Sequence, residues 1–166
     1  MIFDFGAYVI DVDVEKTADY YRNDSITTCD CLACRNFNCL APNFPQEVRH
    51  FLTQLGLDPA RPQELSVDYA PTKNTMCYSG FYYLCGTALQ FRKIWIQESE
   101  KRYRFNDACM MPIHDDFAVC FSEPWFGVVD VDFPKPIVEL HFTCILPWVM
   151  EEPHHYHTQI GDDENA

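Results

Sequence analysis

IVELHFTCIL, residues 137–146, alternates apolar with polar side chains from Val138 to Cys144. The apolar set is Val138, Leu140, Phe142 and Cys144, and the polar set between them is Glu139, His141 and Thr143. A period of two places successive side chains on opposite faces of an extended chain, with one face packed and the other open. This stretch therefore predicts a half-buried strand of a sheet.

Short stretches of the same character recur from residue 64 onward, and one precedes them near the N-terminus. The predicted strands are residues 7–14, 64–69, 78–89, 116–121 and 127–132, whereas 88–98 and 103–108 do not favour one structure. Helical signals are confined to the N-terminal third, at 14–22, 33–40 and 45–55. In the last of these, Val48, Phe51, Leu52 and Leu55 form one helical stripe, with Pro45 before it and Gly56 after it.

Helices grouped before a run of strands at hairpin spacing are typical of an α+β fold, here N-terminal helices packed on a mainly antiparallel sheet. A chain of 166 residues is most simply one domain. We assign residues 1–150 to it and 151–166 to a flexible acidic tail that contains histidines.

The balance of charges restricts the classes of partner. The chain has 12 Lys and Arg against 25 Asp and Glu, for a net charge of −13. Nucleic-acid binding requires a basic face, so it is disfavoured, and a basic protein is the partner that this charge suits. The competing interpretation is that the acidity serves solubility alone.

No apolar run reaches the length of roughly 20 residues that a membrane span requires. The N-terminal segment lacks the basic start of a secretory leader. We therefore expect a cytoplasmic protein, in which the nine cysteines stay reduced.

Four of these cysteines lie within eleven residues, in CDCLACRNFNC (29–39). Thiolates are the preferred ligands of structural zinc, and Cys29, Cys31 and Cys34 are the predicted metal ligands. Cys39 follows Cys34 by five positions, which places it poorly for the same ion if the segment is helical. The candidates for a fourth ligand are Cys39, Cys85, His141, Cys144 or a histidine of the tail.

Two other interpretations of these cysteines remain open. Cys31 and Cys34 form a C-x2-C pair, which at a helix N-terminus can supply a reactive thiolate and a resolving partner for a thiol-dependent enzyme. Alternatively, the thiols are packing residues, since free cysteine is among the most buried side chains.

Two further groups of potential ligands have simpler interpretations. His154, His155 and His157 can bind a transition metal, but a solvated tail is the simpler account. Asp130 and Asp132 share one face of a predicted strand and can bind a cation or act as an acid/base pair, although solvent-facing residues give the same pattern.

The segment 29–37 (CDCLACRNF), the 45–56 helix with Leu57-Asp58-Pro59, and the ending Leu146-Pro147-Trp148 resemble a group of small bacterial proteins. The resemblance implies a bacterial or phage origin and transfers no activity or catalytic residue.

The interpretation that these observations favour is a non-enzymatic, acidic, protein-binding domain of the adaptor or toxin-neutralising type, with a cysteine-rich structural site for zinc. The alternatives are a thiol-dependent enzyme that uses Cys31 and Cys34, and a metal-binding or sensor domain.

Overall fold

The structure, a computed structural model, describes residues 1–23, 29–124 and 132–156. Within these residues the chain forms three α-helices and a mainly antiparallel sheet, with the helices before most of the strands. The predicted α+β class is therefore confirmed. None of the described helices has the length and apolar character needed to cross a membrane.

The helices begin and end close to the predicted positions. They are α1 (Val14–Asn23), α2 (Leu32–Leu40) and α3 (Gln46–Gln54), with the 3-10 turns η1 (Ala41–Asn43) and η2 (Asp107–Cys109). Asp13 caps α1, because its carboxylate accepts a hydrogen bond from the Lys16 amide at 3.1 Å. Gly56 follows α3 at a φ of +83°, a conformation that suits glycine after a helix end.

The strands include two that the sequence did not signal, β1 and β7. In chain order they are β1 (Ile2–Asp4), β2 (Val9–Val12), β3 (Glu64–Thr72), β4 (Thr75–Gln90), β5 (Trp95–Ser99), β6 (Arg102–Phe105), β7 (Met111–His114), β8 (Phe117–Ser122) and β9 (Ile137–Pro147). The ambiguous regions 88–98 and 103–108 supply β5 and β6, which form a hairpin of their own. The strand predicted at 127–132 lies outside the described residues, apart from its last residue.

The long strand β4 organises the main sheet, whose order is β1-β2-β4-β9-β8-β7. Its first half pairs with β3 and its last residues pair with β2, while β9 follows its other edge from Thr75 to Cys85. All of these pairings are antiparallel. The N-terminal strand thus joins the later sheet, as its isolation in the sequence predicted.

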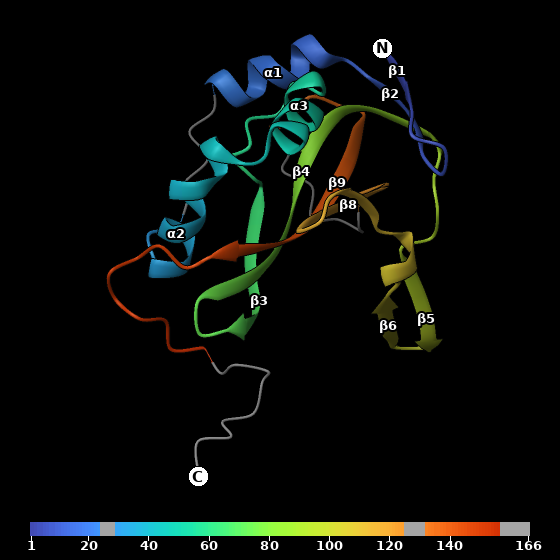
Figure 1. Cartoon of the computed structure of the whole chain (residues 1–166). Helices are drawn as coiled ribbons and strands as arrows, with labels where there is room; N and C mark the ends of the chain where they lie inside the picture. The colour runs from blue at the N-terminus through green and yellow to red at the C-terminus, as the bar shows by residue number, and fades with distance from the viewer. Residues whose placement is uncertain (24–28, 125–131, 157–166) are drawn as a thin grey trace.

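The alternation of β9 divides the molecule into two sides. Val138, Leu140, Phe142 and Cys144 are each no more than 2% exposed and belong to the hydrophobic core. The α2 residue Phe37 packs against Phe142 and Tyr78 with ring centroids 5.9 and 5.5 Å apart. The three helices gather along one side of the sheet (Figure 1).

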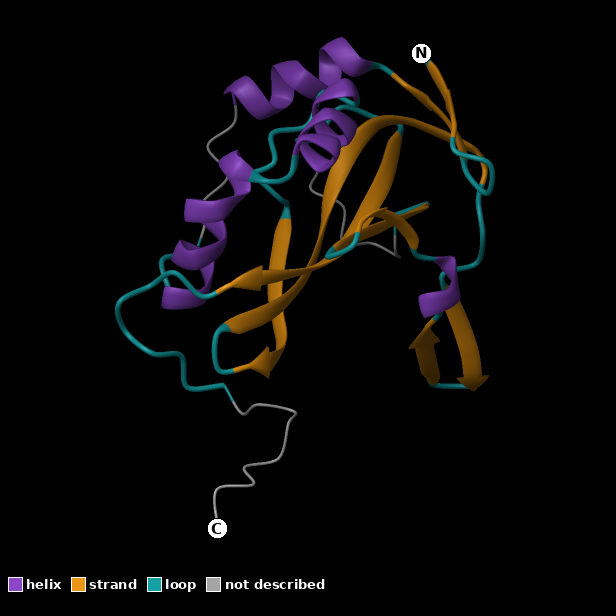
Figure 2. Cartoon of the chain, viewed as in Figure 1, coloured by secondary structure: helices purple, strands orange, loops and turns teal. Residues whose placement is uncertain are grey.

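Away from these helices, the β5–β6 hairpin stands apart from the main sheet (Figure 2). The segment that follows β9 turns back beside α2 (Figure 1). It is held there by Asn36 of α2, whose side chain donates to the Pro147 carbonyl at 3.1 Å and accepts from the Val149 amide at 2.8 Å. Residues 151–156 of the predicted tail are described and contact the folded chain, and residues 157–166 lie outside the described part.

Candidate metal centre

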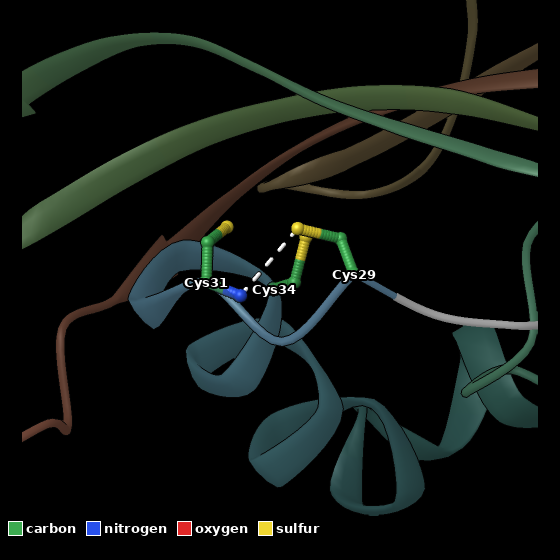
Figure 3. A group of neighbouring side chains, drawn as sticks. All are labelled: Cys29, Cys31 and Cys34. Atoms are coloured by element: carbon green, nitrogen blue, oxygen red, sulfur yellow. Dashed lines mark hydrogen bonds between the residues drawn. The ribbon is translucent and has the colours of Figure 1, made fainter.

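Cys29, Cys31 and Cys34 come together at the beginning of α2. Their sulfur atoms all lie within 4.8 Å of one another. Cys31 is the N-cap of the helix, Cys34 lies in its first turn, and Cys29 precedes both. The three side chains point toward one another from the loop and the helix start (Figure 3). We call these residues the cysteine group.

The local chain geometry explains why a loop followed by a helix can gather three thiols. The Cys31 amide donates to the Cys29 sulfur at 3.4 Å, which folds the loop back over the helix start. The first helical bond then runs from the Arg35 amide to the Cys31 carbonyl at 2.9 Å. Because the amides of the first helical turn have no intrahelical acceptor, they are free to face the sulfur atoms.

The two thiols of the C-x2-C pair are electrostatically different. The Cys34 amide lowers the pKa of the exposed Cys31 thiol, with help from the neighbouring thiols and the Ala33 amide. Burial raises the pKa of Cys34 to about 12, and the Cys31 and Cys29 sulfurs add to this rise. Negative charge on one sulfur therefore opposes charge on the next, and a bound cation would reverse that effect.

The spacing fits a tetrahedral metal. Zinc–sulfur bonds of ~2.3 Å in a tetrahedron place the sulfurs about 3.8 Å apart, so small side-chain rotations from the observed positions are sufficient. The cysteine group is thus close enough to bind a metal ion.

Four of the candidates that the sequence offered for a fourth ligand lie outside the cysteine group, namely Cys39, Cys85, His141 and Cys144. Cys39 is exposed toward the end of α2. Cys85 is buried on β4, with its sulfur 4.0 Å from the Lys135 carbonyl. Cys144 is buried on β9 with a pKa raised by burial, and His141 bonds Ser122 and Glu139 instead.

The C-terminal segment shares a pocket with one residue of the cysteine group. Cys31 lines a pocket of about 330 Å³ together with Leu32, Ala33, Trp148, His154, His155 and Tyr156. Burial raises the pKa of Tyr156, and the sulfurs of Cys31, Cys34 and Cys29 raise it further. The segment predicted to be a tail therefore brings His154 and His155 to the pocket that Cys31 lines.

His154 has one ring nitrogen engaged and one unengaged. Its Nε2 lies 3.0 Å from the Lys73 carbonyl oxygen, which can only accept, so Nε2 carries the proton. Its Nδ1 then carries the lone pair, and this buried atom has no hydrogen-bond partner among the described residues. The sequence pattern identified this histidine but not its surroundings.

A second polar cluster lies on the opposite side of the sheet. His141 Nε2 is 3.0 Å from the Ser122 hydroxyl and 3.1 Å from the Glu139 carboxylate. A Ser-His-acid triad requires the acid on the other ring nitrogen, so this arrangement does not orient the imidazole as a base for the serine. Asp130 lies outside the described residues, which leaves the predicted pair of Asp130 with Asp132 without a geometry.

Comparison with protein-family models, with curated proteins and with solved structures finds no match to this chain. The site must therefore be interpreted from its own chemistry.

Proposed function

We propose that the chain is a non-enzymatic, protein-binding domain in which Cys29, Cys31 and Cys34 hold a structural zinc ion. The observation that carries the zinc assignment is the convergence of three sulfur atoms within 4.8 Å at a helix start. Zinc favours thiolate ligands, and first-turn amides stabilise thiolates at this position.

The third thiol distinguishes a metal site from a dithiol redox site. A redox pair needs two cysteines, whereas zinc needs several ligands around one point. Cys29 is held beside the pair by the bond from the Cys31 amide. Cys29 can therefore serve as a third metal ligand, whereas dithiol exchange does not require it.

The fourth ligand in this proposal is His154, through Nδ1. The bond from Nε2 to the Lys73 carbonyl fixes the ring tautomer in the way that backbone carbonyls orient metal-bound histidines. His154 is outside the group that lies within 4.8 Å, so its ring moves toward the thiols on binding. Zinc would then join α2 to the segment that follows β9.

A structural ion of this kind stabilises a binding surface instead of performing chemistry. The net charge of −13 suits a basic partner, because complementary charge speeds association and selects against other partners. The adaptor and toxin-neutralising roles both belong to this class.

The test is metal content and affinity in the untagged full chain. We expect one zinc per chain by native mass spectrometry, and Cys31→Ser to weaken zinc binding by at least about 100-fold. Cys39→Ser is the matched control, since Cys39 is an exposed thiol of the same helix outside the cysteine group. Absence of zinc binding, or equal loss in both variants, contradicts the metal assignment.

The fourth ligand is tested separately with His154→Gln and His155→Gln. We expect the first to weaken zinc binding by about 100-fold and the second to have a small effect. With Co²⁺ as a probe, His154→Gln should shift the ligand-field bands and retain the thiolate charge-transfer bands. An unchanged spectrum and affinity in His154→Gln would remove this histidine and leave the three thiols assigned.

The second candidate function is a thiol-dependent enzyme, which the pKa difference between Cys31 and Cys34 favours. In that role Cys31 thiolate attacks a substrate disulfide, Cys34 resolves the mixed disulfide, and the substrate leaves as two thiols. Zinc-free protein incubated with oxidised glutathione would then form a Cys31–Cys34 disulfide and turn over repeatedly with a reductant. Failure to turn over excludes this function.

A further inference from the structure

A cavity of about 570 Å³ lies between the sheet and the β5–β6 hairpin, and none of the residues that line it belongs to the cysteine group. Its lining comes from β3, β4, β5, β6, η2 and β9. The size is typical of pockets for small ligands or single side chains.

Aromatic rings form a continuous wall of this cavity. Trp95 and Phe105 are cross-strand partners in the hairpin, with ring centroids 5.4 Å apart. Phe105 lies 6.4 Å from the ring of His141, and His141 lies 5.8 Å from Phe81 on the neighbouring strand. The wall thus crosses from the hairpin to the sheet.

Apart from His141, the ionisable groups of the lining are all carboxylates. They are Glu64, Asp68, Asp107 and Glu139, and among the described lining residues none is Lys or Arg. Arg102 and Arg104 of the hairpin pair with Glu98, and neither lines the cavity. The acidity of the cavity is therefore not neutralised by the basic residues nearest to it in sequence.

Glu139 gives the cavity a fixed carboxylate at depth. It is 5% exposed, and its Oε2 atom lies 3.1 Å from His141 Nε2 and 3.5 Å from the Ser122 hydroxyl. Asp68 lies at the exposed rim, where its carboxylate accepts a 2.8 Å hydrogen bond from the Ser79 hydroxyl. Carboxylates thus lie both at the floor and at the mouth.

We propose that this cavity binds a guanidinium group carried on an apolar stem. Guanidinium is planar, stacks on aromatic faces and forms paired hydrogen bonds with carboxylates, so both features of the lining recognise it. A compact ammonium uses the charge but gains less from the stacking surface. The ligand is an arginine side chain of a partner or a free guanidino compound.

The site does not depend on the zinc proposal, and its test uses different probes. Acetyl-arginine-methylamide is titrated into the full chain by calorimetry, with acetyl-citrulline-methylamide as the isosteric uncharged control. We expect citrulline to bind at least about tenfold more weakly, because its urea group carries no positive charge to pair with the carboxylates. Equal binding of the two probes, or no arginine binding up to about 10 mM, overturns the proposal.

Variants locate the binding in this cavity. Asp107→Asn alters an exposed rim carboxylate, and Trp95→Leu removes the largest ring, each with an expected loss of about fivefold. Glu47→Gln, an exposed carboxylate of α3 outside the cavity, is the control and should leave binding unchanged. Near-ultraviolet circular dichroism confirms folding of each variant, and unchanged binding in both cavity variants overturns the assignment.

Two further probes distinguish an arginine side chain of a protein from a free guanidino compound. Butylguanidine presents the group on an apolar stem without a second charge, and a five-residue peptide with central arginine presents it from a backbone. Tighter binding of the peptide identifies a protein side chain, which agrees with the expected basic partner. Tighter binding of butylguanidine identifies a small guanidino compound as the ligand of the same cavity.

Discussion

The cysteine group and the cavity contrast in how the chain builds them. The cysteine group draws three soft ligands from six consecutive residues, and its geometry follows from one loop and one helix start. The cavity draws hard carboxylates and rings from strands and turns spread between residues 64 and 143. The first therefore suits a transition metal, and the second suits an organic cation. The class of ligand that each site suits follows from the chemistry of its side chains. How easily a mutation disrupts each site follows from the number of helices and strands that build it.

The strongest test of this contrast removes the metal. With free zinc about a thousand times its Kd, chelation should lower the free energy of unfolding by about 4 kcal/mol. Arginine binding to the cavity should stay unchanged, because the two sites share no lining residue. Urea unfolding with and without chelator measures the first quantity, and calorimetry measures the second. A loss of both would show that the sites are coupled.

A second test disturbs the sheet beneath the cavity. A Cβ atom on Gly80 would lie 2.1 Å from the Glu64 carbonyl oxygen and 3.0 Å from the Phe142 ring. Gly80→Ala should therefore destabilise the fold by about 3 kcal/mol and weaken arginine binding. Thr87→Ala, at an exposed position of the same strand, is the control for urea unfolding. A change below about 1 kcal/mol in Gly80→Ala would contradict the tight β3–β4 contact.

A third test separates α2 from the C-terminal segment. Asn36 is fully buried and bonds Tyr78, Pro147 and Val149. Asn36→Ala removes these three hydrogen bonds and should cost about 2 kcal/mol of unfolding free energy. It should also weaken zinc binding if His154 is the fourth ligand, because the segment that carries His154 is released. Asn38→Ala, on the same helix and partly exposed, should do neither.

The smallest effect concerns the thiols within the cysteine group. Without metal, Cys31 should react with iodoacetamide more than about tenfold faster than Cys34, because only thiolate reacts. Since the pKa of Cys31 is lowered, its rate should rise with pH and reach its half-maximum below the ordinary thiol value. Cys34, with a pKa of about 12, should stay slow over that range. Peptide mass spectrometry gives both rates, and equal rates would contradict the assigned environments.

The elements were predictable where one face of a segment is buried. The stripe of Val48, Phe51 and Leu52 predicted α3, and all three residues are buried. The alternation at Val138 to Cys144 predicted β9 and its core face. β1 and β7 were not predicted, because such short strands at the sheet edge or end carry little periodicity.

The candidate site was predictable only in part. Cys29, Cys31 and Cys34 lie close together because they are neighbours in the sequence, in one loop and the first turn of one helix. The position of His154 instead depends on the path of the segment that follows β9, which packs beside α2. No sequence spacing relates residue 31 to residue 154. The surroundings of His154 therefore became visible only with the fold.

By itself, the sequence determined the α+β class, the helix and strand faces and the three neighbouring thiols, because each follows from interactions over a few residues. Tertiary structure alone decided that Glu139 and His141, on the polar face of β9, form the floor of a cavity instead of facing solvent. A strand's period of two separates its faces but does not say what covers them. Here the β5–β6 hairpin supplies that cover, with Trp95 and Phe105 lining the same cavity.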